Sequence, residues 1–164
     1  MAKNIKLAII NPKGKNEIIE FFDYNCIHCK RVAKVIDDFL KTRNDVRVVL
    51  RPIPILGQRS LYTTQIGYAI LLLDTDKYLD FYNMVMDSSD GIGELIYDIT
   101  DKININIEGL KTILRNNNDD IKQSIEDNID LADKFGIQGT PSFIVNGKVI
   151  QGEIDAETLD KMFA

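Results

Sequence analysis

The fold of this chain is decided by the stretch IIEFFDYNCIHCK, residues 18–30. This stretch contains both cysteines of the 164-residue sequence, Cys26 and Cys29, and its single histidine, His28. The β-branched and aromatic residues before Cys26 are typical of a buried strand. Apolar residues then recur at helical spacing, at Val32, Val35, Ile36, Phe39 and Leu40. We therefore expect Cys26 where a strand passes into a helix, at or near the helix N-terminus.

A cysteine in that position is chemically reactive. The first backbone N–H groups of a helix have no intrahelical partner and carry partial positive charge. They stabilise a thiolate and so lower the pKa of a cysteine placed there. Cys26, nearer the solvent end, is the predicted attacking sulfur, and Cys29, one turn further in, is predicted to resolve the mixed disulfide. His28 is a third local group that can favour the thiolate electrostatically.

Other uses of a CxxC pair stay open. A closed structural zinc site needs four Cys or His ligands. Beyond Cys26, His28 and Cys29 the sequence offers none, so carboxylates or a second subunit would have to complete it. Haem attachment requires a histidine directly after the second cysteine, where this chain has Lys30. Two unreactive core cysteines are a further alternative. The clustering favours a redox disulfide without metal or cofactor.

Glu20 is an unusual residue within the predicted buried strand, six positions before Cys26. A carboxylate on a strand that is buried on both faces is energetically costly. Glu20 is therefore expected either at an edge, or paired with a lysine or arginine, or as a buried carboxyl beneath the cysteines that relays the proton of Cys29. The residues alone do not choose between these.

Composition limits the remaining function classes. The chain is 45% apolar with a net charge of −5, which suits one globular domain with an insertion and argues against a nucleic-acid partner. The longest apolar run, residues 68–73, is far too short for a membrane span. Residues 1–10 lack the apolar core of a signal peptide. The chain is thus expected to be the mature form of an exported protein, or cytoplasmic.

The rest of the chain predicts a mixed sheet interrupted by helices. Strands are expected at 5–10, 17–24 and 46–50, with a helix at 27–42 that makes the last two strands parallel neighbours. Residues 59–135 have the spacing of four or five helices and no clear strand. Polar breaks separate these helices at 74–76, 88–91, 104–106 and 116–120.

The C-terminal residues predict a hairpin followed by a helix. The strands are expected at 142–145 and 148–151, with Asn146-Gly147 as a type I′ turn. Asp155 is a plausible N-cap for the final helix. Pro141, at the start of the first of these strands, is compatible with an ordinary trans bond or with a cis peptide.

Two separated motifs together resemble the DsbA-like thiol–disulfide oxidoreductases of the thioredoxin superfamily. They are EFFDYNCIHCK at residues 20–30 and GIQGTPSFIV at 136–145. RPIPILG at 51–57 is similar to the segment that precedes the family's helical insert. The resemblance covers essentially residues 11–164, and the combination of CxxC with Gly-Thr-Pro is far more specific than either motif alone.

The resemblance implies an α/β, thioredoxin-like fold in which helices flank a mixed central sheet. Residues 1–57 and 136–164 would form the thioredoxin-like domain, and 58–135 an inserted all-helical domain. Cys26 would be the nucleophile of a Cys26–Cys29 redox disulfide, and Glu20 matches the family's buried acid.

The resemblance also assigns the binding of substrate to residues around the cysteines. The Thr140–Pro141 peptide would be cis and packed against Cys26, which leaves the Thr140 backbone free to pair with an extended polypeptide. Ile27, Thr140 and Pro141 would thus form the substrate-binding surface. The expected substrates are unfolded or reduced proteins.

The function implied is a protein disulfide oxidase in the periplasm, acting on exported proteins and reoxidised by a membrane quinone-linked partner of the DsbB kind. Ile27-His28 replaces the Pro-His of the best-known oxidases, and Thr140 before the proline is common in isomerases. The chain lacks the N-terminal arm of oligomeric isomerases, which favours a monomer and an oxidase. An isomerase or reductase kept reduced by a partner, and a redox-independent chaperone or binding module, are the alternatives.

Overall fold

A mixed five-stranded sheet forms the centre of the part of the chain that the computed structural model describes, residues 4–88 and 96–164. The strands are β1 (Ala8–Ile10), β2 (Asn16–Phe22), β3 (Val46–Pro52), β4 (Ser142–Val145) and β5 (Lys148–Gln151). Their order across the sheet is β1-β3-β2-β4-β5. β2 and β3 are parallel as expected, and the other three pairs are antiparallel. Central β2 therefore joins the parallel half to the hairpin half.

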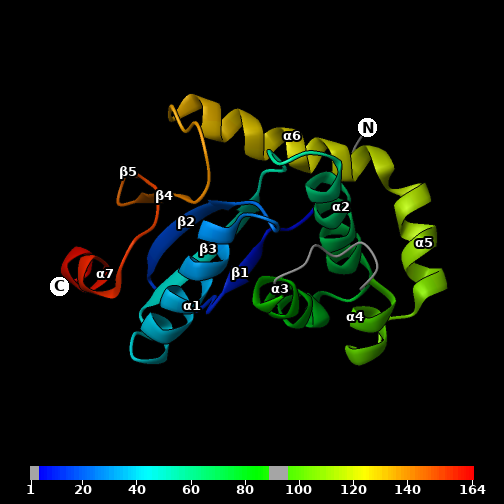
Figure 1. Cartoon of the computed structure of the whole chain (residues 1–164), viewed down its shortest axis with the longest axis horizontal. Helices are drawn as coiled ribbons and strands as arrows, with labels where there is room; N and C mark the ends of the chain where they lie inside the picture. The colour runs from blue at the N-terminus through cyan, green and yellow to red at the C-terminus, as the bar shows by residue number, and fades with distance from the viewer. Residues whose placement is uncertain (1–3, 89–95) are drawn as a thin grey trace.

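Both faces of the sheet are covered, which explains why β2 contains the adjacent apolar pairs Ile18-Ile19 and Phe21-Phe22 instead of a strict alternation of apolar and polar residues. Successive side chains of a strand point to opposite faces. Ile18 and Phe22 belong to the core cluster that includes residues of α1 (Ile27–Lys41) and α7 (Ala156–Met162). Phe21 belongs to a second cluster with Ala132 of α6 (Asn118–Lys134). Figure 1 shows α1 and α7 together at one side of the sheet and α6 along the other.

Among the described residues between β3 and β4, the regular elements are all helices, as the sequence predicts. Its further helices are α2 (Gln58–Leu73), the 3-10 helix η1 (Thr75–Lys77), α3 (Tyr78–Asp87), α4 (Ile96–Lys102) and α5 (Ile107–Asn116). The predicted break at 88–91 lies, after Ser88, outside the described residues. The domain limits of 58 and 135 stay a prediction. None of the described helices combines the length and apolar character needed to cross a bilayer.

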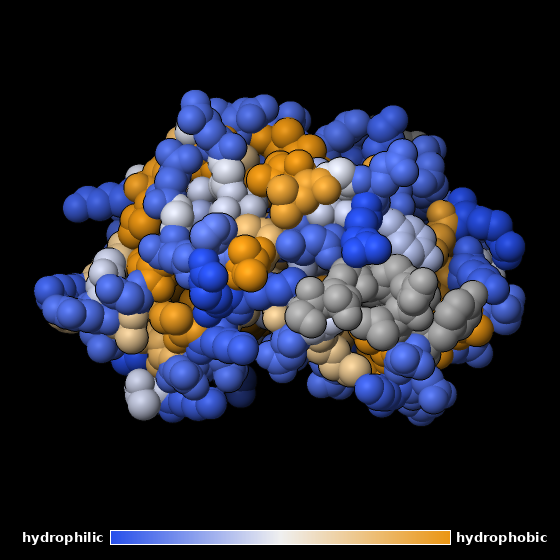
Figure 2. Space-filling model, in the orientation of Figure 1, coloured by the Kyte–Doolittle hydropathy of each residue, from blue (hydrophilic) through white to orange (hydrophobic). Residues whose placement is uncertain are grey.

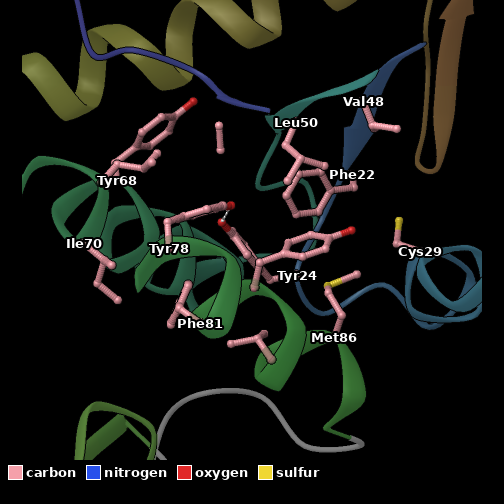
Figure 3. Packing of buried hydrophobic residues seen from close by; sticks show 14 of the residues in the cluster. Phe22, Tyr24, Cys29, Val48, Leu50, Tyr68, Ile70, Tyr78, Phe81 and Met86 are labelled. Carbon is pink, nitrogen blue, oxygen red and sulfur yellow. Dashed lines mark hydrogen bonds between the residues drawn. The ribbon is translucent and has the colours of Figure 1, made fainter. Parts of the chain in front are cut away.

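An aromatic cluster packs the loop after β2 against the helices. The hydroxyl groups of Tyr24 and Tyr78 lie 2.5 Å apart, and the Phe22 ring packs edge-on against the Tyr24 ring (Figure 3). A Cβ at Gly67 of α2 would lie 2.6 Å from the Tyr24 hydroxyl, so this close approach requires glycine. One continuous core thus connects the sheet with the helical segment.

Local signals near the C-terminus are confirmed. Asn146 and Gly147 both have positive φ, 52° and 78°, as a type I′ hairpin requires. The Asp155 side chain accepts a hydrogen bond from the Thr158 backbone N–H at 2.8 Å and caps α7. β2 ends at Phe22, two residues earlier than predicted, because Asp23 begins a turn whose carbonyl accepts from the Cys26 N–H.

Candidate active site

The two cysteines lie on the first turn of α1 in different surroundings. Cys26 is the N-cap residue, and its Sγ accepts a hydrogen bond from the Cys29 backbone N–H at 3.4 Å. Both are free thiols. Cys26 is 6% exposed and Cys29 is fully buried. The expected placement of Cys26 at the helix N-terminus, nearer to solvent than Cys29, is therefore confirmed.

The loop before β4 faces the same turn. The Thr140–Pro141 peptide bond is cis, so the cis alternative is the one observed. The Thr140 carbonyl accepts a hydrogen bond from the Cys26 thiol, with a sulfur–oxygen distance of 3.6 Å. The structure thus brings together the two motifs that lie far apart in the sequence. The use of Thr140 and Pro141 in binding substrate stays a prediction.

Cys29 faces the apolar interior. Figure 3 shows it beside the cluster that contains Phe22, Tyr24 and Met86. Burial raises the pKa of the Cys29 thiol, because a thiolate there would lose its hydration. A hydrogen bond from the backbone at Asp23 opposes this shift without cancelling it. Cys29 is therefore a neutral thiol when the site is reduced.

Glu20 is buried and is neither at an edge nor paired with a basic residue. Its side chain is 1% exposed, and within the described structure neither carboxyl oxygen has a hydrogen-bond partner. Burial raises the pKa of Glu20 from 4.5 to about 8, so the carboxyl is protonated at neutral pH. Of the readings that the sequence left open, the structure agrees with the buried carboxyl. Transfer of the Cys29 proton through Glu20 stays a prediction.

His28 does not direct Nδ1 toward Cys26. This nitrogen lies 2.8 Å from Oε2 of Glu153 and 2.7 Å from Nη2 of Arg31. Arg31 in turn donates from Nε and Nη2 to the two carboxylate oxygens of Glu153, at 3.0 and 2.9 Å. These hydrogen bonds, from Arg31 first and then His28, lower the pKa of Glu153 to about 2. We call these three residues the outer charge cluster.

Asp23 anchors the loop that carries Cys26, and the sequence analysis did not single it out. Its buried carboxylate accepts from the Asn25 N–H and the Ser60 hydroxyl, at 2.8 and 2.6 Å. It also accepts from the backbone N–H groups of Ile55 and Leu56, at 2.9 and 3.1 Å. Asp23 thus ties the active-site loop to the β3–α2 connection and to α2.

Exposed apolar side chains lie on the segments joined in this way. Ile27 on α1 is 63% exposed, and Ile55 and Leu56 before α2 are 48% and 55% exposed. Figure 2 shows hydrophobic patches near the middle of its face, in the area where Figure 1 places these segments. The predicted role of Ile27 in contacting substrate is compatible with this exposure and stays a prediction.

Two members of the outer charge cluster were missed by sequence reasoning. Arg31 follows His28 by three residues, a spacing that places both on one helix face. Glu153 gives no local signal, because it follows β5 and lies 125 residues from His28 in the chain. The described residues contain no group of three or more His, Cys, Asp or Glu side chains arranged to hold a metal ion.

A dithiol at a helix N-terminus, faced by the cis-proline loop that leads into β4 of a mixed sheet, defines the thioredoxin-like class of thiol–disulfide oxidoreductases. The model of the DSBA-like thioredoxin domain matches residues 17–164. The chain therefore belongs to the DSBA-like thioredoxin domain family.

Individual relatives agree with this assignment. The chain is 27% identical over 159 residues to the "Probable disulfide bond formation protein D" of Bacillus cereus, covering 88% of this chain and 73% of that protein. A thioredoxin-like oxidoreductase from Silicibacter pomeroyi DSS-3 superposes with a TM-score of 0.87 at 27% identity, covering 96% and 90% of the two chains. The thiol-disulfide exchange protein alpha-DsbA2 from Wolbachia pipientis also gives a TM-score of 0.87, at 28% identity, covering 94% and 84%.

Proposed function

We propose that this chain is a protein disulfide oxidase of the DsbA type, which transfers a Cys26–Cys29 disulfide to reduced polypeptides. The observation that carries the proposal is the placement of Cys26. Its sulfur is the N-cap of α1 and contacts the Thr140 carbonyl of the cis-proline loop. A sulfur in this position is stabilised as a thiolate and lies beside a backbone edge that an extended chain can pair with.

The reaction consists of two thiol–disulfide exchanges. A substrate thiolate attacks Sγ of Cys26, a substrate–Cys26 bond forms, and Cys29 leaves as a thiolate that takes up a proton. A second substrate thiolate then attacks the substrate sulfur of this mixed disulfide, and Cys26 leaves as a thiolate. The substrate has lost two electrons and gained a disulfide, and the enzyme is a dithiol.

The buried acid supports the first of these steps. Burial raises the pKa of Cys29, so the departing thiolate is a strong base that must be protonated. Glu20 is on the same face of β2 as Phe22, which packs in the core cluster of Cys29. A carboxyl with a pKa of about 8 holds a proton at neutral pH that it can give up. In this proposal Glu20 supplies that proton.

Partners and location follow from the same proposal. The substrates are unfolded or reduced exported proteins, which contact Ile27, Thr140 and Pro141. The dithiol is reoxidised by a membrane quinone-linked protein of the DsbB kind, and the enzyme acts as a monomer in the periplasm. The relatives named as disulfide bond formation proteins support this assignment.

The decisive experiment compares serine variants of the two cysteines. Cys26→Ser should abolish oxidation of a reduced model protein. Cys29→Ser, supplied with a model protein that contains a disulfide, should accumulate a mixed disulfide at Cys26, because Cys26 displaces one substrate sulfur and Cys29 is no longer there to release the other. Oxidation that persists in Cys26→Ser would overturn the proposal, and binding of unfolded protein that survives serine at both cysteines, without any oxidation by the wild type, would indicate a redox-independent binding protein. The reduction potential separates the redox alternatives, since DsbA lies near about −120 mV and thioredoxin near about −270 mV.

A further inference from the structure

The outer charge cluster joins the helix that carries Cys26 to the connection between β5 and α7. His28 and Arg31 are on α1, and Glu153 lies two residues after the end of β5. All three side chains are exposed by between 39% and 55%. Exposed ion pairs contribute little to stability. Stability alone therefore does not explain why these three side chains come together next to the dithiol.

The geometry gives Glu153 a particular part in this cluster. His28 Nδ1, Arg31 Nη2 and Glu153 Oε2 lie within 2.7–2.9 Å of one another. Nη2 of arginine always donates. If Nδ1 of His28 carries a proton, it donates to the carboxylate of Glu153, because Arg31 cannot accept. If Nδ1 carries no proton, it accepts a hydrogen bond from Arg31. In both states the two contacts between Arg31 and the carboxylate fix the guanidinium in place.

The cluster is within electrostatic reach of the nucleophile. The pKa of Arg31 is raised chiefly by its hydrogen bond and charge interaction with Glu153, with a smaller contribution from the charge of Cys26. The helix supplies the geometry, because Arg31 follows the N-cap residue Cys26 by five positions, a rise of about 8 Å along α1, and its guanidinium charge acts over that distance on a thiolate formed at Cys26. The carboxylate of Glu153 is the only negative group of the cluster. Its charge reduces the net positive charge that the cluster exerts on Cys26.

We propose that Glu153 is a positioning residue that holds Arg31 and His28 beside Cys26 while offsetting their charge, and thereby makes the Cys26–Cys29 disulfide less oxidising. This inference rests on the proposed function of the two cysteines. Groups that stabilise the Cys26 thiolate favour the dithiol form and make the disulfide a stronger oxidant. A fixed carboxylate next to these groups acts in the opposite direction.

Two substitutions test this proposal with opposite expected signs. Glu153→Gln leaves the positive charge unopposed and should shift the equilibrium with glutathione toward the dithiol enzyme by about 2- to 10-fold, the order of magnitude expected for one partly screened surface charge. Arg31→Gln should shift it toward the disulfide by a similar factor. The double variant should return to within about 2-fold of the wild type, because the two charges are removed together.

A second readout follows the thiolate directly. The pH midpoint of the thiolate absorbance of the reduced protein should fall in Glu153→Gln and rise in Arg31→Gln. Both effects should shrink as salt is raised from about 0.01 to 1 M, because exposed charges are screened over a distance that falls from about 30 to 3 Å.

The matched control is the Glu157–Lys161 pair of α7. It is an exposed ion pair of the same signs, with 3.0 Å between Nζ and Oε1, and it makes no part of the cluster. Glu157→Gln and Lys161→Gln should each change the glutathione equilibrium by less than about 2-fold, since screening weakens their more distant charges.

Three results would overturn the role of Glu153. The first is a glutathione equilibrium in Glu153→Gln that equals that of the wild type, and the second is a shift in this variant toward a weaker oxidant. The third is a shift of the same sign in Glu153→Gln and Arg31→Gln, which would indicate a purely structural contact. Failure of the proposed function would look different, because the wild type itself would then either not exchange with glutathione or have the reduction potential of a reductase instead of that of an oxidase. In that case the thiolate titration would still decide whether Glu153 acts on Cys26.

Discussion

The inner and outer sides of the first turn of α1 place the same functional group in opposite environments. On the outer side, Cys26 keeps 6% of its surface exposed, its sulfur caps the helix N-terminus, and Arg31, further along α1, forms a charged pair with Glu153. On the inner side, Cys29 has no exposed surface and packs with the apolar core. Lost hydration raises the pKa of the inner thiol. The comparison teaches that three residues of sequence are enough to place two thiols in different environments, one at a helix N-terminus and one in an apolar core.

Alkylation of the reduced protein provides the sharpest form of this comparison. At pH 7 iodoacetamide should modify Cys26 more than about 1,000-fold faster than Cys29, because only an accessible thiolate reacts. The rates are measured by mass spectrometry on the Cys29→Ser and Cys26→Ser variants, each of which has one thiol. Comparable rates in the two variants would remove the distinction between the two sides. The denatured variants are the control, and there the rates should be equal.

A change at Glu20 tests whether lost hydration governs the inner side. The pKa of this carboxyl is raised from 4.5 to about 8 in the folded protein, so the folded state holds a proton that the unfolded state releases. The contribution of Glu20 to the free energy of unfolding should therefore be largest below pH 4.5 and should decrease as pH rises toward 8, by about 3 kcal/mol at pH 7. Glu20→Gln should remove this decline and be more stable than the wild type by a similar amount at pH 7.

Urea denaturation between pH 4.5 and 8.5 measures this effect. Glu17→Gln is the control on the same strand, where the carboxylate is partly exposed and pairs with Arg47. It should retain the decline of the wild type. Wild-type stability that is independent of pH over this range would show that Glu20 is hydrated, contrary to its burial.

A smaller effect is expected at Asp23, which holds the loop between the two sides. Asp23→Asn replaces an acceptor by an amide that turns donor hydrogens toward the N–H groups of Ile55 and Leu56. The free energy of unfolding should fall by about 2 kcal/mol, the cost of unsatisfied buried donors. Asp76→Asn, at an exposed position of η1, should change it by less than about 0.5 kcal/mol. An Asp23→Asn protein as stable as the wild type would show that this carboxylate does not anchor the loop.

The sequence predicts best what short-range chemistry determines. The two residues Asn146 and Gly147 are enough to predict the hairpin turn. Asp155 caps α7 by accepting a hydrogen bond from the backbone of a residue only three positions away. The strand-to-helix change around Cys26 is likewise local. The cis bond at Pro141 was one of two options from the residues, and the family resemblance selected it correctly.

The contacts that the sequence did not predict depend on distant groups. Asp23 accepts hydrogen bonds from the backbone N–H groups of residues 55 and 56. The side chains at these positions take no part in the contact, so their residue types do not predict it. Glu153 is one of many surface acids until β5 places it next to α1. Glu20 was recognised as unusual, yet only the packing of both sheet faces shows that its carboxyl has no partner among the described residues.

The order of strands in the sheet has a consequence for the synthesis of the chain. β2 pairs on one side with β3, a few dozen residues later, but on its other side with β4, where Ile18 faces Val145. When a polypeptide emerges N-terminus first, Cys26 appears long before residues 140–145 exist to cover it. Closing so long a loop is also entropically slow. The nascent chain therefore exposes a thiol with no loop beside it, and the finished arrangement of Cys26 against Thr140 is reached only once the last quarter of the chain has been made.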